Sequence, residues 1–203
     1  MSFSLQSGVK MSKYPWYGRH QKDEGLDQGL ILPDFPIPDY SGVNYTALAT
    51  DEDVALPIEI RTSDLIIMTQ ACDISNDKVK NITLCKIYPL NEYLETARIG
   101  KKEANNLVSN LNSNRVSNMH LLNRPDANPY GGAFEDFLVV KFDESVVFPV
   151  RLVQQALKSP GRLIKLMPPY RESLAQAYGA FFMRIGDPQD REMAYSVCYE
   201  SIL

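Results

Sequence analysis

Two apolar runs on either side of a short polar stretch constrain the fold of this chain more than any other feature. Residues 65–68, LIIM, and residues 82–90, ITLCKIYPL, have the composition of buried strands. Residues 75–81 between them, SNDKVKN, are rich in turn formers and charge. Strands joined by so short a connection pair in the antiparallel sense. The sequence therefore predicts a β-hairpin over residues 64–90, with residues 75–81 as its exposed tip.

The remaining strand and helix signals are short. Further strands are expected at residues 30–32, 56–60, 137–142, 146–150 and 162–169, and a short helix at 151–157. Pro33, Pro36 and Pro38 cannot donate to a ladder, so residues 30–32 are expected to form an edge strand that leaves the sheet there. Residues 91–118 are polar and rich in asparagine, with a spacing that suits two short helices. We interpret them as a solvated helical insertion.

The strongest helix signal covers residues 169–186, PYRESLAQAYGAFFMRIG. Proline at its start and Gly186 at its end are typical of helix termini. The apolar residues fall on one stripe at helical spacing: Leu174, Ala177, Tyr178, Phe181, Phe182 and Ile185. Gly179 and Met183 lie away from that stripe. We expect this Gly179/Met183 face to contact a protein partner, a second copy of the chain or the terminal segment 191–203.

These signals together predict an α+β fold. We expect a mainly antiparallel, partly barrel-like sheet, with a helical insertion and a long C-terminal helix packed on the sheet. A chain of 203 residues, 44% hydrophobic and 23% charged, has the length and composition of one globular domain. We therefore predict a single domain, 1–203, with residues 1–13 as a flexible tail and 91–118 as the insertion.

Charge and cysteine content bear on partners and location. A formal net charge of −4 does not favour binding to nucleic acid or to an anionic membrane. No apolar run approaches the roughly 20 residues of a transmembrane helix, so no membrane contact is expected. Three cysteines and no secretory signal favour the reducing cytoplasm. A nucleic-acid module remains a second alternative because the C-terminal half carries several basic residues: Arg151, Lys158, Arg162, Lys165, Arg171 and Arg184.

Cys72, Asp73, Cys85 and His120 are the residues that could form a chemical site. If the hairpin is symmetric about residues 78–79, Cys72 stands opposite Cys85, with Cβ atoms roughly 4.5–5.5 Å apart. If the turn is centred on residues 76–77, Cys72 stands opposite Asn81 instead. The sequence leaves both registers open.

Three interpretations of these residues follow. In the first, both cysteines are buried hydrophobic residues and Asp73 caps the turn. In the second, Cys72, Cys85 and His120 bind zinc, with Asp73 or Cys198 as a fourth ligand, although no Cys-x-x-Cys pair is present. In the third, Cys72 is a catalytic nucleophile activated by His120, with Asp73 or Gln70 assisting.

No motif for nucleotide binding, metalloprotease or serine-hydrolase chemistry is present in the sequence. The favoured function is therefore non-enzymatic, as an accessory or interaction protein without a confidently expected cofactor. The alternative is a cysteine-dependent or zinc-dependent enzyme centred on Cys72.

Four stretches in this order resemble a family of uncharacterised bacterial proteins. They are YPWYG, LDQGLIL, DLIIMTQACDISNDKVKNITLCKIYPL and RLIKLMPPYRESLAQAYGAFFMRIGDP. The resemblance covers residues 14–188, apart from the polar segment 91–118. It implies a bacterial, cytoplasmic, single-domain protein, and it carries no catalytic residue or ligand.

Overall fold

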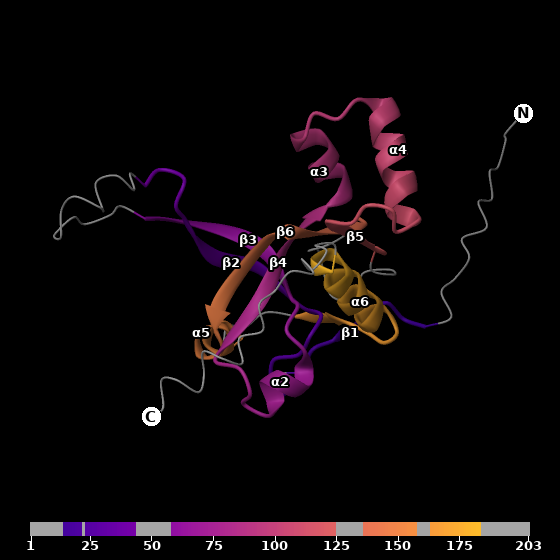
Figure 1. Cartoon of the computed structure of the whole chain (residues 1–203). Helices are drawn as coiled ribbons and strands as arrows, with labels where there is room; N and C mark the ends of the chain where they lie inside the picture. Colours follow the sequence, from indigo (N-terminus) through magenta and orange to yellow (C-terminus); the bar gives the residue numbers. More distant parts are fainter. Residues whose placement is uncertain (1–13, 22, 44–57, 125–135, 158–162, 184–203) are drawn as a thin grey trace, which may run out of the picture.

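A seven-stranded antiparallel sheet forms the centre of the protein, in the order β1-β7-β2-β3-β4-β6-β5 (Figure 1). The computed structural model describes residues 14–21, 23–43, 58–124, 136–157 and 163–183. The strands are β1 (Tyr17–Arg19), β2 (Leu30–Asp39), β3 (Glu59–Ile67), β4 (Asn81–Pro89), β5 (Met119–Leu122), β6 (Leu138–Pro149) and β7 (Ile164–Leu166). The helices are α2 (Ala71–Ser75), α3 (Leu90–Thr96), α4 (Lys101–Asn112), α5 (Val150–Ala156) and α6 (Tyr170–Phe182).

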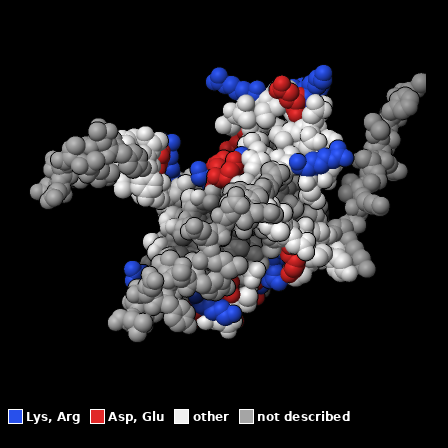
Figure 2. Space-filling model, in the orientation of Figure 1, with Lys and Arg blue, Asp and Glu red and all other residues white. Residues whose placement is uncertain are grey.

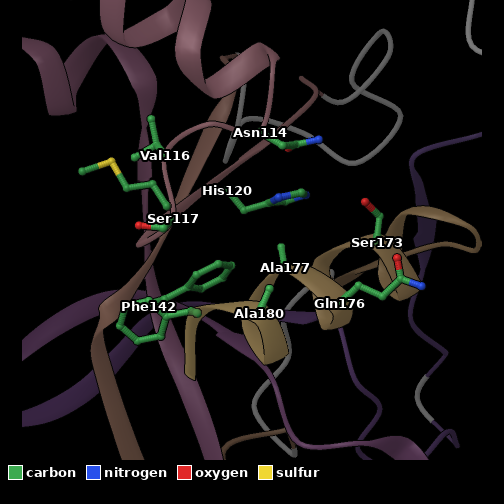
Figure 3. Close-up of a pocket in the computed structure, with 11 residues that line it drawn as sticks. Asn114, Val116, Ser117, His120, Phe142, Ser173, Gln176, Ala177 and Ala180 are labelled. Carbon is green, nitrogen blue, oxygen red and sulfur yellow. The ribbon is translucent and has the colours of Figure 1, made fainter. Parts of the chain in front are cut away.

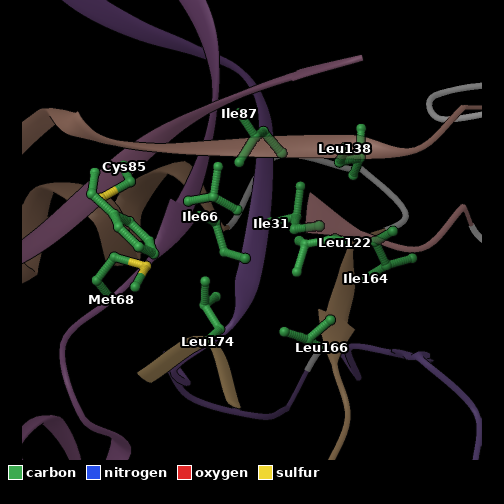
Figure 4. Close-up of a cluster of buried hydrophobic side chains, with 12 residues drawn as sticks. Ile31, Ile66, Met68, Cys85, Ile87, Leu122, Leu138, Ile164, Leu166 and Leu174 are labelled. Atoms are coloured by element: carbon green, nitrogen blue, oxygen red, sulfur yellow. The ribbon is translucent and has the colours of Figure 1, made fainter. Parts of the chain in front are cut away.

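Helices cover both faces of the sheet. On one face α6 packs through Leu174, which is fully buried, onto the cluster shown in Figure 4. That cluster draws Ile31, Ile66 and Ile87 from three neighbouring strands. On the opposite face a second cluster includes Ile74 of α2 and Val153 of α5. Alternate residues of each strand supply the two faces, so the central strands are apolar on both sides.

The predicted hairpin forms, but its tip is different from the expected one. β3 pairs with β4 through residues 65–67, and a short helix, α2, occupies residues 71–75 before the turn. Ile66 is the partner of Cys85, so both registers proposed from the sequence are wrong. Both predicted registers assumed a tight turn with Cys72 in the ladder. They are wrong because residues 71–75 form α2 and do not pair with β4.

The prolines of β2 do not end that strand, contrary to the sequence prediction. β2 continues to Asp39 and pairs with β3, including Pro36 with Thr62 and Pro38 with Ile60. Its pairing with β7 stops at Ile31, so the later half of β2 has a described neighbour on one side only. Residues 36 and 38 are alternate positions, and their nitrogens face this open side, where no donor is required. The prediction of an edge strand therefore holds for the proline-containing half alone.

In two places the structure has one long strand, β3 or β6, where the sequence predicted two short strands. Residues 61–64, expected as a turn, lie inside β3, and residues 143–145 lie inside β6. A register shift between Cys85 and Lys86 absorbs extra residues of β6 as a bulge. Polar residues interrupt an apolar run in both places, which is the signal that suggested a break.

The helical insertion forms α3 and α4, as predicted, but it is not simply solvated. Leu90 and Leu111 are buried against Val139 in a third cluster. This cluster covers the end of the sheet formed by β5 and β6, on the face opposite α6. A few apolar positions at helical spacing are sufficient to bury one side of α4.

The predicted α+β fold with an antiparallel sheet and a C-terminal helix is confirmed, and the sheet is not closed into a barrel. β1 and β5 lie at its two ends, and neither has a second described neighbour. The apolar stripe of α6 is confirmed for Leu174, Ala177, Tyr178 and Phe181, which pack on the sheet. Phe182 is instead 57% exposed, and Ile185 lies outside the described residues.

Candidate functional site

The three residues proposed as zinc ligands do not come together. Cys85 is buried in the cluster beneath α6, whereas α2, which carries Cys72, packs through Ile74 on the opposite face of the sheet. His120 lies on β5, and Figure 1 shows β5 well separated from α2. In the described part of the chain, no three His, Cys, Asp or Glu side chains are placed to share a metal ion. Cys198, the other suggested ligand, lies outside the described residues.

Cys72 is an exposed thiol in the first turn of α2. Its Sγ contacts Gln70 Oε1 at 3.6 Å and Asp73 Oδ1 at 3.7 Å, and Asp73 faces Lys78 at 3.8 Å. The histidine suggested as its base, His120, is therefore not one of its polar partners. Cys85 is also a free thiol, and burial raises its pKa to about 12. The first interpretation, a buried hydrophobic cysteine, describes Cys85 but not Cys72.

A hollow among the described residues instead surrounds His120. Two cavities of about 370 and 380 Å³ lie between α6 and the segment that runs from the end of α4 into β5. Asn114, His120 and Ser173 line both, so the two cavities adjoin, and we call them together the β5 slot. Figure 3 shows His120 between the loop that carries Asn114 and helix α6.

Four uncharged polar side chains converge on this slot. Asn114 ends the turn after α4, where its φ of 51° places it in the left-handed region that asparagine tolerates. Ser173 and Gln176 face it from α6 (Figure 3). His120, 6% exposed, lies between them, and none of the four side chains has a hydrogen-bond partner among the described residues. Asn114, Ser173 and Gln176 are exposed to solvent and His120 is largely buried, so a ligand in the slot could reach all four polar side chains.

Burial sets the charge of His120. Desolvation lowers the pKa of its imidazole, so the ring is neutral at pH 7 and presents one donor and one acceptor. Its ring lies 6.5 Å from that of Phe142, with 18° between the planes. Phe142 in turn contacts Tyr178 and Phe181 of α6. The His120 ring therefore lies over the aromatic cluster that α6 forms with β6.

The lining of the slot is free of formal charge. No Asp, Glu, Lys or Arg is among the described residues that line the two cavities. Apolar side chains line both cavities. The cavity of about 380 Å³ has Trp16, Tyr170, Phe137, Leu111 and Leu121, and the cavity of about 370 Å³ has Phe142, Phe181, Val116 and Met119. Trp16 and Tyr170 stack with ring centroids 3.7 Å apart.

His120 is the one residue of this slot that the sequence analysis named as a candidate site residue, and Ala177 and Phe181 appeared there only as part of the apolar stripe. One available signal was the face of α6 formed by Ser173, Gln176, Ala177 and Ala180, which are spaced at helical intervals and are mostly small. Small residues at these positions leave space against the sheet, whereas larger ones would fill it.

Charged side chains lie elsewhere and carry both signs. Figure 2 shows blue and red groups interspersed over the visible face, without a continuous basic patch. Of the basic residues noted in the sequence, Lys165 pairs with Glu24 at 2.9 Å and Arg171 with Asp27 at 3.4 Å. Lys158, Arg162 and Arg184 lie outside the described residues. The described cations thus give no support to the nucleic-acid alternative.

No protein family, curated protein or solved structure matches this chain. The resemblance to uncharacterised bacterial proteins stays a prediction. Among the described helices, none has the length and apolar character needed to cross a bilayer.

Proposed function

We propose that this chain is a non-enzymatic recognition protein of the cytoplasm that binds an uncharged, partly apolar ligand in the β5 slot. The single observation that carries the proposal is that Asn114, His120, Ser173 and Gln176 converge on one hollow with no side-chain hydrogen bond to a described residue. An apolar cavity with a few convergent polar groups is the usual form of a ligand site.

The lining indicates the charge of the ligand. A carboxylate or ammonium group would lose its hydration in a slot where the described residues offer no counter-charge. An amide or hydroxyl group, by contrast, finds donors and acceptors in the neutral His120 imidazole and the Asn114 amide. The ligand class favoured by the lining is therefore neutral, with amide-like polar groups.

Non-enzymatic binding is favoured over catalysis because the described lining residues do not form a catalytic set. His120 is the one titratable group capable of proton transfer near pH 7 among the described lining residues, and no described carboxylate orients it. A histidine without an orienting partner or a nearby nucleophile is better suited to holding a ligand than to transferring a proton.

The experiment compares neutral and charged fragments of the same shape. Benzamides, benzoates and benzylamines are titrated against ¹⁵N,¹³C-labelled protein, and chemical-shift changes are followed by NMR. We expect benzamides to shift the His120 ring signals and the amides of Ser173 and Gln176, and the two charged series to shift them at least about 10-fold less at equal concentration.

Two substitutions on α6 form a matched pair. Ala180→Leu places a larger side chain in the slot from an exposed position, whereas Ala175→Leu makes the same change at a residue outside both cavities. Ala180→Leu is expected to remove the benzamide shifts, and Ala175→Leu to leave them unchanged. Shifts that survive Ala180→Leu, or benzoates that bind as well as benzamides, contradict the proposal.

A further inference from the structure

We propose that the ligand of the β5 slot is an extended peptide segment that pairs with β5 as an eighth strand of the sheet. This inference rests on the proposed function and names the class of partner. β5 is the last strand in the sheet order, and its outer edge has no described strand beside it. The two cavities follow this edge.

The register of β5 and β6 shows which backbone groups face the slot. Phe142 N donates to Asn118 O at 2.9 Å, and Met119 is the partner of Lys141 in the next pair. In an antiparallel ladder, hydrogen-bonded and non-hydrogen-bonded pairs alternate. His120 is therefore bonded toward β6, whereas the N–H and C=O groups of Met119 and Leu121 point outward, into the slot.

A contact at the end of β5 supports this alternation. The Tyr17 hydroxyl donates to the carbonyl oxygen of Asn123 at 2.6 Å. Residue 123 is in the same alternate set as residues 119 and 121, so its carbonyl also faces outward, and here a side chain of β1 satisfies it. The Tyr17 hydroxyl thereby marks one end of this edge, and the outward backbone groups of Met119 and Leu121 have no hydrogen-bond partner among the described residues.

The walls of the slot fit a strand and its side chains. On the face of the sheet that α6 covers, the cavities are bordered by Ala177 and Ala180. On the opposite face they are bordered by Leu111 and Leu121. An added strand would direct alternate side chains to these two walls. The peptide residue opposite His120 would lie beneath α6, and its two neighbours would face the α4 side.

The peptide chemistry follows from the lining. Both walls combine apolar and uncharged polar side chains, and no charged residue is among the described residues that form them. The segment that fits has apolar or neutral polar side chains and no charge over about four residues, with backbone amides that match Met119 and Leu121. Strand addition of this kind obtains its affinity from the main chain and its specificity from alternate side chains.

The experiment starts from a phage-displayed library of random heptapeptides without charged residues. Peptides are selected on the full chain and counter-selected on the Ala180→Leu variant. One selected peptide is then synthesised in two N-methylated forms, each methylated at one alternate set of nitrogens. Amide hydrogen exchange of the protein is measured with and without the unmodified peptide.

A strand pairs along one edge, so the two N-methylated forms should differ. Methylation of the nitrogens that face β5 is expected to weaken binding about 10-fold or more, since two main-chain hydrogen bonds to β5 are lost. Methylation of the other set should change affinity by less than about 2-fold. The bound peptide should also slow exchange of the Met119 and Leu121 amides, while that of His120, already bonded to β6, changes little.

Each other outcome separates this inference from the proposed function. A peptide that tolerates both methylation patterns, or that leaves Met119 and Leu121 unprotected, overturns strand addition. A library that yields no peptide, while benzamides still bind the slot, also overturns it and leaves the proposed function intact. If neither fragments nor peptides bind, both proposals fall.

Discussion

Replacement of Leu174 by alanine tests how α6 is held on the sheet. Leu174 is 0% exposed and is the one described residue of α6 in the fully buried class. Its side chain lies among the residues of the cluster beneath the helix, next to Leu166 and Met68 in Figure 4. The position of α6, and with it one wall of the β5 slot, depends on this contact.

The magnitude follows from the atoms removed. Leu→Ala deletes three carbon atoms, each worth roughly 0.8 kcal/mol of transfer free energy, or about 2.4 kcal/mol together. The vacated space adds a cavity term, and fully buried leucines lose about 2.7–5 kcal/mol in total. For a chain of this size, about 2–4 °C of Tm is lost per kcal/mol. We therefore expect the Tm to fall by roughly 6–20 °C.

Thermal unfolding followed by circular dichroism, with urea titration as a second measure, provides the assay. Met183→Ala is the control, since Met183 is on the same chain segment and is 84% exposed. Its free energy of unfolding should change by less than about 0.5 kcal/mol. If Leu174→Ala costs less than about 1 kcal/mol, α6 is not anchored as described, and the walls of the slot are not those given above.

Three further predictions concern single sites. Gly29→Ala should lower the free energy of unfolding by about 1–3 kcal/mol in urea titration, because the backbone φ is +80° and a Cβ would lie 3.0 Å from a β7 side chain; an unchanged midpoint would contradict this conformation. In a Cys198→Ser background, Ellman's reagent should modify Cys72 rapidly and Cys85 only after unfolding, since burial raises the pKa of Cys85 to about 12; two equally fast thiols would refute the burial of Cys85. Burial lowers the pKa of His120, so the folded state binds fewer protons than the unfolded state. The contribution of His120 to the free energy of unfolding should be fully present above the unfolded pKa of about 6.5 and should decrease as the pH falls below it. Urea titration at several pH values should show a smaller decrease for His120→Gln.

The local parts of the fold were predictable because they depend on short sequence windows. The stripe from Leu174 to Phe181 predicted α6, and the asparagine-rich segment predicted the two helices of the insertion. The apolar runs around residues 66 and 85 predicted paired strands. In each case the hydrophobic period of ten to fifteen residues or fewer carries the information.

Predictions that required knowledge of a neighbour were wrong. Pro36 and Pro38 break a strand only if their nitrogens face a partner, and that depends on where β7 stops. The partner of Cys85 depended on α2, a five-residue helix that local propensity does not specify. The bulge in β6 depended on its alignment with β4.

By itself the sequence determined the central apolar strand segments, the helices of the insertion, α5 and α6, because hydrophobic spacing is a property of neighbouring residues. Only the tertiary structure decided that β5 lies at an open edge and that small residues of α6 stand across from His120. The slot is a space between elements far apart in the chain. A space of this kind is set by how those elements pack against one another, and no single stretch of residues encodes it.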